Sequence, residues 1–252
     1  MRSSHKANSV TQLLYLDDQH LLEAKSTVVS CIEKNDEVRI IFDQTPMYVK
    51  RGGQPGDQGI VTGEGFNIVI RDVVYDEGGD IVHIGTLQGR IPGKDEKVTV
   101  KVDSAVRRLH SLWHSAGEAV IVAAKIAGFD KPVSAAIHYG SNQNRIEYQA
   151  KLDSEHVEQL KAQIEANLKK IIRDDTLIDL LNLTDKNEVI EHCGFWPDYL
   201  QEGDTIRVVK VRPDYTGRPC TGTHLAHTSE LGKVWIEKIK VKGDKIIISY
   251  GC

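Results

Sequence analysis

The sequence contains few cysteines and no long apolar run. Its four cysteines include no closely spaced pair: Cys31, Cys193, Cys220 and Cys252. A disulfide framework is therefore not indicated, and a reducing cytosol is the expected compartment. The first ten residues lack the apolar core of a secretory signal. No stretch reaches the roughly 18 apolar residues that a membrane-spanning helix needs. We expect a soluble, cytoplasmic protein.

The chain also lacks an excess of positive charge and the common nucleotide-binding signatures. Its formal net charge of -4 excludes a uniformly basic nucleic-acid-binding protein, although a local basic patch can still bind RNA. No Gly-Lys-Ser/Thr follows the glycine-rich segment at residues 51–59, and there is no dinucleotide fingerprint. The sequence therefore gives no support to ATP or NAD chemistry.

The first hundred residues have the pattern of β structure. Short runs rich in valine and isoleucine alternate with clusters of glycine, aspartate and proline. These runs predict strands at residues 26–31, 37–42, 66–75, 81–87 and 97–102. Several short strands at this spacing indicate a small barrel or sandwich.

The pattern becomes helical after about residue 102. Apolar residues recur at helical spacing to residue 126, with Asp103 or Ser104 as N-cap and Gly128 as stop. A second helix is predicted over residues 154–173. The remaining runs predict strands at residues 133–137, 145–148, 206–211, 233–241 and 245–250. The predicted fold class is α+β, with a β-rich, barrel-like N-terminal domain over residues 1–100. An α/β domain over residues 101–252 follows, with its helices packed on an antiparallel sheet.

Two pairs of potential metal ligands lie far apart in the chain. His110 and His114 are four residues apart on the first predicted helix, so they share one face. Cys220 and His224 form a second pair with the same spacing. One thiolate and three imidazoles suit tetrahedral zinc. A purely structural zinc site remains an alternative, because a catalytic zinc usually keeps one position open.

The segment at residues 51–59, Arg-Gly-Gly-Gln-Pro-Gly-Asp-Gln-Gly, is unusually rich in glycine. It can be a turn between two strands. It can also be a loop of exposed backbone that lets a phosphate or the end of a polymer approach closely. The residues alone leave both interpretations open.

Three segments together resemble the editing domain of alanyl-tRNA synthetase and its free-standing relatives, the AlaX proteins. The first segment covers residues 45–59 and consists of Thr-Pro-Met-Tyr-Val-Lys followed by the glycine-rich segment. The second is Leu-His-Ser-Leu-Trp-His at residues 109–114. The third covers residues 219–232 and contains Cys-Thr-Gly-Thr-His. The resemblance spans nearly the whole chain, from about residue 12 to its end. It implies the medium-length class of these proteins, with a β-rich N-terminal domain and an editing domain.

The resemblance also implies a ligand set and an activity. The zinc ligands of the family fall on His110, His114, Cys220 and His224, and its glycine-rich motif falls on Gly52, Gly53, Gly56, Asp57 and Gly59. The implied reaction is zinc-dependent hydrolysis of the ester bond of mischarged tRNA(Ala), foremost Ser-tRNA(Ala), by a protein acting in trans without ATP. Thr221 stands where the family usually has glycine, and Trp113 is bulkier than usual. The segment at residues 129–132 lacks a glutamine that some relatives carry. These departures concern the substrate more than the fold.

Roles in the reaction are expected for several further residues. Thr223 is the candidate catalytic side chain, because its hydroxyl can hydrogen-bond a seryl group; alternatively it only shapes the turn before His224. Contacts with the 3′ end of tRNA are expected from the following residues: Arg51, Gly52, Gly53, Gly56, Asp57, Arg107 and Arg108. Glu118 and His227 are candidates for orienting a ligand.

Two other functions fit the same residues. One is a non-catalytic module that binds tRNA and is stabilised by zinc. The other is a zinc hydrolase that acts on small esters or amides. Turnover of aminoacyl-tRNA separates both from a deacylase.

Overall fold

A computed structural model describes residues 11–34, 37–140, 142–197, 200–201 and 203–252. The chain divides into two compact units. Unit 1 comprises the residues up to Arg51 and Pro55–Leu109, and unit 2 comprises Gly52–Gln54 and His110–Cys252. The boundary between the two units thus lies after Leu109, within the helix α1 (Ser104–Ile126). The division into domains over residues 1–100 and 101–252, expected from the sequence, stays a prediction.

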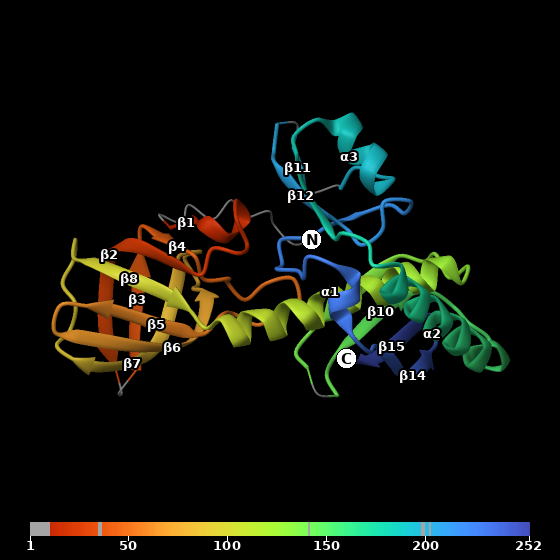
Figure 1. The fold of residues 1–252 in the computed structure, drawn as a ribbon, viewed down its shortest axis with the longest axis horizontal. Helices are drawn as coiled ribbons and strands as arrows, with labels where there is room; N and C mark the ends of the chain where they lie inside the picture. Colours follow the sequence, from red (N-terminus) through yellow and green to blue (C-terminus); the bar gives the residue numbers. More distant parts are fainter. Residues whose placement is uncertain (1–10, 35–36, 141, 198–199, 202) are drawn as a thin grey trace. The chain divides into compact units, whose positions relative to one another are not determined.

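Unit 1 is built around a closed antiparallel barrel with the strand order β2-β3-β7-β6-β5-β8 (Figure 1). Its strands are β2 (Glu23–Lys34), β3 (Glu37–Phe42), β5 (Gly59–Gly63), β6 (Phe66–Tyr75), β7 (Ile81–Gly89) and β8 (Lys97–Val102). Every second residue points inward. In β3, for example, Val38, Ile40 and Phe42 are buried in the barrel core. The five strands predicted for this region are all present.

Unit 1 also contains a small two-stranded sheet beside the barrel strands. The short strands β1 (Gln12–Leu13) and β4 (Gln44–Thr45) pair in parallel, and η1 (Leu14–Leu16) follows β1. The ring of Tyr15, in η1, meets that of Tyr48 edge to face at 5.1 Å. This aromatic pair joins the segment after β4 to the barrel core.

A buried ion pair within unit 1 ties the glycine-rich segment to the first turns of α1 (Ser104–Ile126). Arg107 Nε donates to Asp57 at 2.9 and 3.1 Å, and its terminal nitrogens donate to the carbonyls of Gln19 at 2.7 Å and Pro46 at 2.8 Å. Asp57 also accepts from the backbone N–H of Tyr48 at 2.7 Å. Both charged side chains are buried, so these contacts replace their solvation.

Helix α1 begins and ends where the sequence predicts. Asp103 Oδ1 accepts from the N–H groups of Ala105 and Val106 at 2.9 and 3.1 Å, as an N-cap does. The helix ends at Ile126, and Gly128 follows with φ +82°, a left-handed conformation that favours glycine. In unit 2 the helix buries a face of small residues, among them Ala116 and Ala123.

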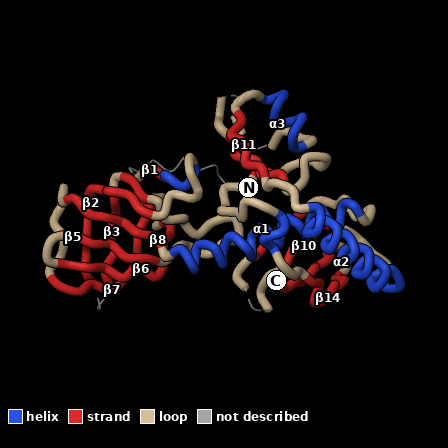
Figure 2. Tube along the Cα trace, in the orientation of Figure 1, coloured by secondary structure: helices blue, strands red, loops and turns tan. Residues whose placement is uncertain are grey.

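The core of unit 2 lies between α1, α2 (Val157–Asp174) and a four-stranded antiparallel sheet of order β14-β15-β10-β9 (Figure 2). The strands are β9 (Val133–Ile137), β10 (Arg145–Gln149), β14 (Trp235–Lys242) and β15 (Lys245–Gly251). Helix α2 buries the predicted apolar face: Leu160, Ile164, Leu168 and Ile171. The turn η2 (Ser154–His156) directly precedes α2, and η3 (Thr228–Leu231) contributes Leu231 to this core.

A second sheet in unit 2 was only partly anticipated. Strand β12 (Ile206–Lys210) pairs with β11 (Asp179–Leu183) and with β13 (Arg218–Pro219), and α3 (Lys186–Cys193) packs on them over a small apolar cluster. The sequence predicts β12 but neither α3 nor its other partners. Strand β13 leads directly into the segment that contains Cys220.

The predicted α+β class is confirmed by the barrel and by the helices packed on antiparallel strands. Among the residues that the structure describes, no helix is both long and apolar enough to cross a bilayer.

We predict that the stability of the barrel depends on pH through His83. His83 is fully buried; Nδ1 donates to Ile40 O at 3.3 Å, and Nε2 lies 2.9 Å from Thr45 Oγ1. Burial lowers the pKa of His83 to about 4 from its usual 6.5. Because the unfolded chain then takes up the proton more readily, the stabilisation is complete above pH 6.5 and is lost as the pH falls towards 4. The full loss is about 3 kcal/mol.

The measurement is the free energy of unfolding between pH 7.5 and 4.5. His83→Gln should flatten this dependence, whereas His156→Gln, at an exposed position, should leave it unchanged. Parallel curves for the protein and His83→Gln would refute this role for His83.

We predict a large cost for breaking the ion pair of Asp57 and Arg107. Asp57→Asn leaves a guanidinium buried without its counter-charge and should lower the free energy of unfolding by about 3–5 kcal/mol. Glu96→Gln is the matched control, because the Arg90–Glu96 pair lies exposed on the same barrel. Denaturant unfolding should show little change for Glu96→Gln; equal losses for both variants would contradict the prediction.

Candidate metal centre

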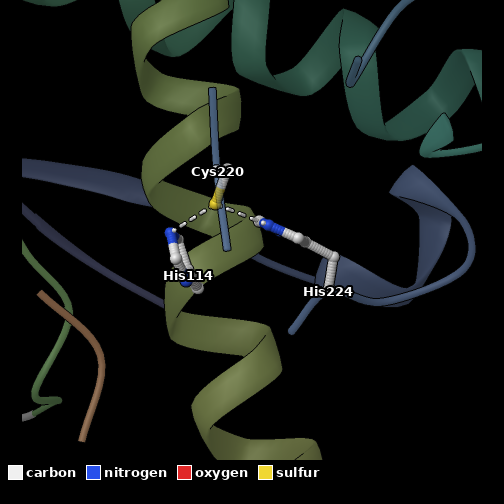
Figure 3. Close-up of side chains that lie close together, drawn as sticks. All are labelled: His114, Cys220 and His224. Atoms are coloured by element: carbon white, nitrogen blue, oxygen red, sulfur yellow. Dashed lines mark hydrogen bonds between the residues drawn. The ribbon is translucent and has the colours of Figure 1, made fainter. Parts of the chain in front are cut away.

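Three side chains from two distant parts of the chain meet inside unit 2. His114 projects from α1, and Cys220 and His224 lie on the segment after β13 (Figure 3). Cys220 Sγ is 3.4 Å from His114 Nε2 and 3.2 Å from His224 Nε2, and all three donor atoms lie within 4.8 Å of one another. All three residues are buried.

The segment that contains Cys220 is held by the neighbouring strand. The N–H of Cys220 donates to Arg207 O at 2.9 Å. The guanidinium of Arg207, from β12, donates in return to the carbonyls of Cys220 and Gly222. The cation thus fixes the backbone on either side of Thr221, which positions the thiol.

Gly222 allows this segment to approach α1. A Cβ at this position would lie 2.1 Å from the ring of His114 and 2.9 Å from Gln54 Oε1. Real Cβ atoms do not make such contacts, so a side chain here would displace the His114 imidazole.

Gln54, from the glycine-rich segment, determines which nitrogen of His114 carries a proton. Its Oε1 accepts from the backbone N–H of Thr223 at 3.0 Å and lies 2.7 Å from His114 Nδ1. A backbone N–H can only donate, which fixes Oε1 on that side of the amide. Nδ1 must therefore be the protonated nitrogen, and Nε2 presents a lone pair towards Cys220 Sγ.

Hydroxyl groups complete the network. Gln54 Nε2 donates to Thr223 Oγ1 at 2.9 Å, and Thr223 Oγ1 lies 2.7 Å from Ser111 Oγ. Ser115 Oγ accepts from the N–H of Leu225 at 3.0 Å and lies 3.3 Å from His224 Nδ1. Residues of α1 therefore hold the turn on which His224 lies.

The electrostatic environment keeps the donors uncharged when no cation is bound. Burial, followed by neighbouring basic groups, holds the pKa of His114 and of His224 well below 6.5. Burial and the nearby Glu118 carboxyl raise the pKa of the Cys220 thiol to about 12. A divalent cation bound to these donors would lower the pKa of the Cys220 thiol, because the cation stabilises the thiolate directly.

The donor set fits zinc. In a tetrahedral site with Zn–S of about 2.3 Å and Zn–N of about 2.0–2.1 Å, sulfur and nitrogen are about 3.6 Å apart. The two S···N distances of 3.4 and 3.2 Å are within a few tenths of an ångström of that value. Two neutral imidazoles and one cysteine, as its thiolate, are also donors that zinc prefers.

His110 is not a member of this group. It is buried one helical turn before His114, and its ring centroid is 5.3 Å from that of Trp113. Its role as a fourth ligand stays a prediction. The carboxyl of Glu118 also borders the donors, with Oε1 at 4.0 Å from His114 Nε2 and Oε2 at 3.5 Å from Arg218 Nε.

The residues expected to contact tRNA have different environments. Arg51, Gly52 and Arg108 are exposed. Gly53 packs against β9, because its Cβ would meet the carbonyl oxygen of Ala136 at 2.1 Å, and Gly56 is buried. Asp57 and Arg107 are buried against each other, so the structure does not support their expected phosphate contacts. Thr223, the candidate catalytic residue, is buried beside the donors.

Sequence reasoning missed two neighbours of the donors. Gln54 lies in the glycine-rich segment at residues 51–59, and its polar side chain between Gly53 and Pro55 is the signal in the sequence that points to it. His138, after β9, stacks on His114 with ring centroids 4.4 Å apart, and its Nδ1 lies 2.6 Å from the hydroxyl of Tyr250. Nothing in the local sequence around His138 signals this contact.

The fold and the donor set thus define an α+β protein with a candidate zinc centre, and sequence comparisons identify its relatives. The family model described as tRNA synthetases class II (A) matches residues 5–106. The alanyl-tRNA editing protein AlaX-L of Pyrococcus horikoshii is 27% identical over 94% of this chain and 56% of its own length. Alanine–tRNA ligases of Halobacterium salinarum and Bacillus pumilus are each 30% identical, over 90% and 84% of this chain and 24% of their own lengths.

The chain is therefore related to the AlaX-type alanyl-tRNA editing proteins, as its motifs predicted. It spans about half the length of the editing protein and about a quarter of the ligases that it matches.

We predict that Gln54 controls metal affinity through His114. Gln54→Met removes the acceptor for His114 Nδ1 and should weaken zinc binding about 10–100-fold, the usual effect of losing a group that orients a ligand. Gln54→Glu keeps an acceptor oxygen and should retain more affinity. Zinc affinity is measured by competition with a chromogenic chelator, and the tautomer of His114 by nitrogen NMR of the metal-free protein.

Gln58→Met is the matched control, since Gln58 is exposed in the same segment. It should bind zinc like the unmodified protein. Unchanged affinity and an unchanged His114 tautomer in Gln54→Met would show that Gln54 has no such role.

Proposed function

We propose that the protein is a zinc-dependent aminoacyl-tRNA deacylase that hydrolyses the ester bond of mischarged tRNA(Ala), foremost Ser-tRNA(Ala), and acts in trans in the cytoplasm. The meeting of His114, Cys220 and His224 carries this proposal, because it brings one histidine of the first predicted ligand pair to both residues of the second pair. The relationship to an alanyl-tRNA editing protein supports the substrate class.

His114, Cys220 and His224 would hold the zinc, with His110 as the candidate for a fourth position. When bound, zinc supplies a Lewis acid that polarises an ester carbonyl or lowers the pKa of water. The residues of the chain supply the rest. Gln54 keeps the lone pair of His114 Nε2 directed at the donors, and burial excludes bulk water. The carboxyl of Glu118 can take up a proton released in hydrolysis.

The paired hydroxyls of Thr223 and Ser111 support serine as the amino acid that is removed. One hydroxyl donates to the other, and Gln54 Nε2 donates to Thr223. Whichever hydroxyl donates in the pair, the proton of the other remains for a further acceptor, such as a seryl hydroxyl. A site that bonds a hydroxyl discriminates against alanine, because an unpaired buried polar group costs about 1–3 kcal/mol.

The decisive experiment is a deacylation panel on tRNA(Ala) charged with serine, glycine or alanine and on threonyl-tRNA, with and without a chelator. Ser-tRNA(Ala) should be hydrolysed fastest, and the chelator should abolish the activity. Cys220→Ala should lose both zinc and at least about 100-fold in kcat/KM, since it removes a ligand.

Cys193→Ala is the matched control, because that cysteine is buried in the separate apolar cluster of α3, β11 and β12. It should retain zinc and activity. A full zinc content with no turnover of any charged tRNA would favour a non-catalytic module. Activity on small esters alone would favour the other hydrolase.

A further inference from the structure

The face of the four-stranded sheet that points away from α2 is strongly basic. Residues directly opposite each other on paired strands share a face. The registers place Lys238 beside Ser249 and Arg145, and Lys242 beside Lys245. Five cationic side chains therefore share this face, which we call the open face: Lys238, Lys240, Lys242, Lys245 and Arg145.

Among the paired residues of β10, β14 and β15 on this face, Glu147 is the one acidic side chain. Glu147 accepts from Lys245 at 2.8 Å and from Arg145 at 3.0 Å. Within the described part of the chain, the three β14 lysines have no acidic partner, and all three are exposed: Lys238, Lys240 and Lys242. They alternate with Ile239 and Val241, which point into the core. The three uncompensated charges thus form a row along an edge strand.

An aromatic ring lies at the end of the same row. Trp235 opposes Gly251 in the register, and a Cβ at Gly251 would meet the indole ring at 2.3 Å, so the ring covers that glycine. Trp235 is 40% exposed, and Lys233 Nζ lies 5.8 Å from its ring centroid. An exposed aromatic ring beside a row of cations is typical of surfaces that bind single-stranded nucleic acid.

Another exposed surface of unit 2, that of α2, lacks this excess of positive charge. The exposed side of α2 carries both signs, with Glu158 and Asp174 among its lysines and Arg173. The whole chain has a net charge of -4. A face with an excess of positive charge on an otherwise acidic protein attracts a polyanion by local charge complementarity.

We propose that the open face binds the sugar–phosphate backbone of the tRNA substrate, in addition to the contacts that its aminoacylated end makes at the metal centre. The proposal rests on the proposed function for the identity of the RNA. The lysines of β14 neutralise phosphates, and the ring of Trp235 offers a stacking surface for an unpaired base. Binding of this kind depends on backbone charge and strengthens as salt is lowered.

The test is a titration of uncharged tRNA(Ala) against the variant Lys238→Glu/Lys240→Glu/Lys242→Glu over a series of salt concentrations. Affinity at low salt should fall at least about ten-fold. The slope of log K against log salt should flatten by about two to three, because each lost phosphate contact removes about 0.7–0.9. Replacing the same lysines by Gln gives a milder variant with a smaller loss, and circular dichroism checks its fold.

The matched control is Lys151→Glu/Lys169→Glu/Lys170→Glu, which makes the same change in net charge at exposed positions outside the open face. It should bind tRNA with at most a small loss. Equal losses of tRNA affinity in the two triple variants, or no loss in either, would overturn the proposal. It would also be overturned if the β14 substitutions weakened binding to anionic phosphatidylserine vesicles and left the tRNA affinity unchanged.

This outcome is independent of catalysis. Lost RNA affinity in the β14 variant supports the open face even if no charged tRNA is hydrolysed. Conversely, an active deacylase whose KM and tRNA affinity are unchanged by the β14 substitutions retains its proposed function and loses this surface.

Discussion

The side-chain carbonyl of Gln54 is the contact on which the geometry of the candidate centre depends. It accepts from the backbone N–H of Thr223 and from His114 Nδ1, so one oxygen joins the glycine-rich segment, α1 and the turn before His224. Loss of this acceptor would leave two buried donors unsatisfied, each at a cost of about 1–3 kcal/mol. It would also release the tautomer of His114. The glycine-rich segment thus contributes a polar side chain that orders the donors, besides the close backbone approach that its glycines allow.

Burial gives the donors their chemical character. It lowers the pKa of both imidazoles and raises that of the Cys220 thiol, so without a cation the set is neutral. Three neutral donors can lie close together without repulsion between like charges. Deprotonation of one thiol on binding a dication would leave the centre with a single net positive charge, beside the Glu118 carboxyl. Metal binding at this centre would therefore be coupled to the release of a proton.

The sequence predicts those parts of the fold and site that local patterns determine. Alternating valine and isoleucine predict β3, β6 and β8, and the i, i+4 spacing places His110 and His114 on one helix. It does not predict β5, because its glycines weaken the strand pattern, nor α3, which is short and mostly polar. The contacts of Gln54 and His138 could not be predicted either, since they depend on segments that meet only in the folded chain. The zinc ligation itself and the tRNA contacts stay predictions.

The basic residues show why position along the chain is a poor guide to a binding charge. Arg107 adjoins the first histidine pair in sequence, yet all three nitrogens of its guanidinium donate to Asp57 or to backbone carbonyls inside unit 1. The lysines of β14 belong to no motif, but the pairing of β14 with β15 places them side by side without an acid opposite. A cation that has a buried counter-charge stabilises the fold, and to bind a phosphate it would first have to break that pair. An exposed cation without a counter-charge loses little on meeting a phosphate and releases a counterion. Because the difference lies in what each cation faces after folding, the surface for a polyanion is found from the register of the sheet and not from the motifs.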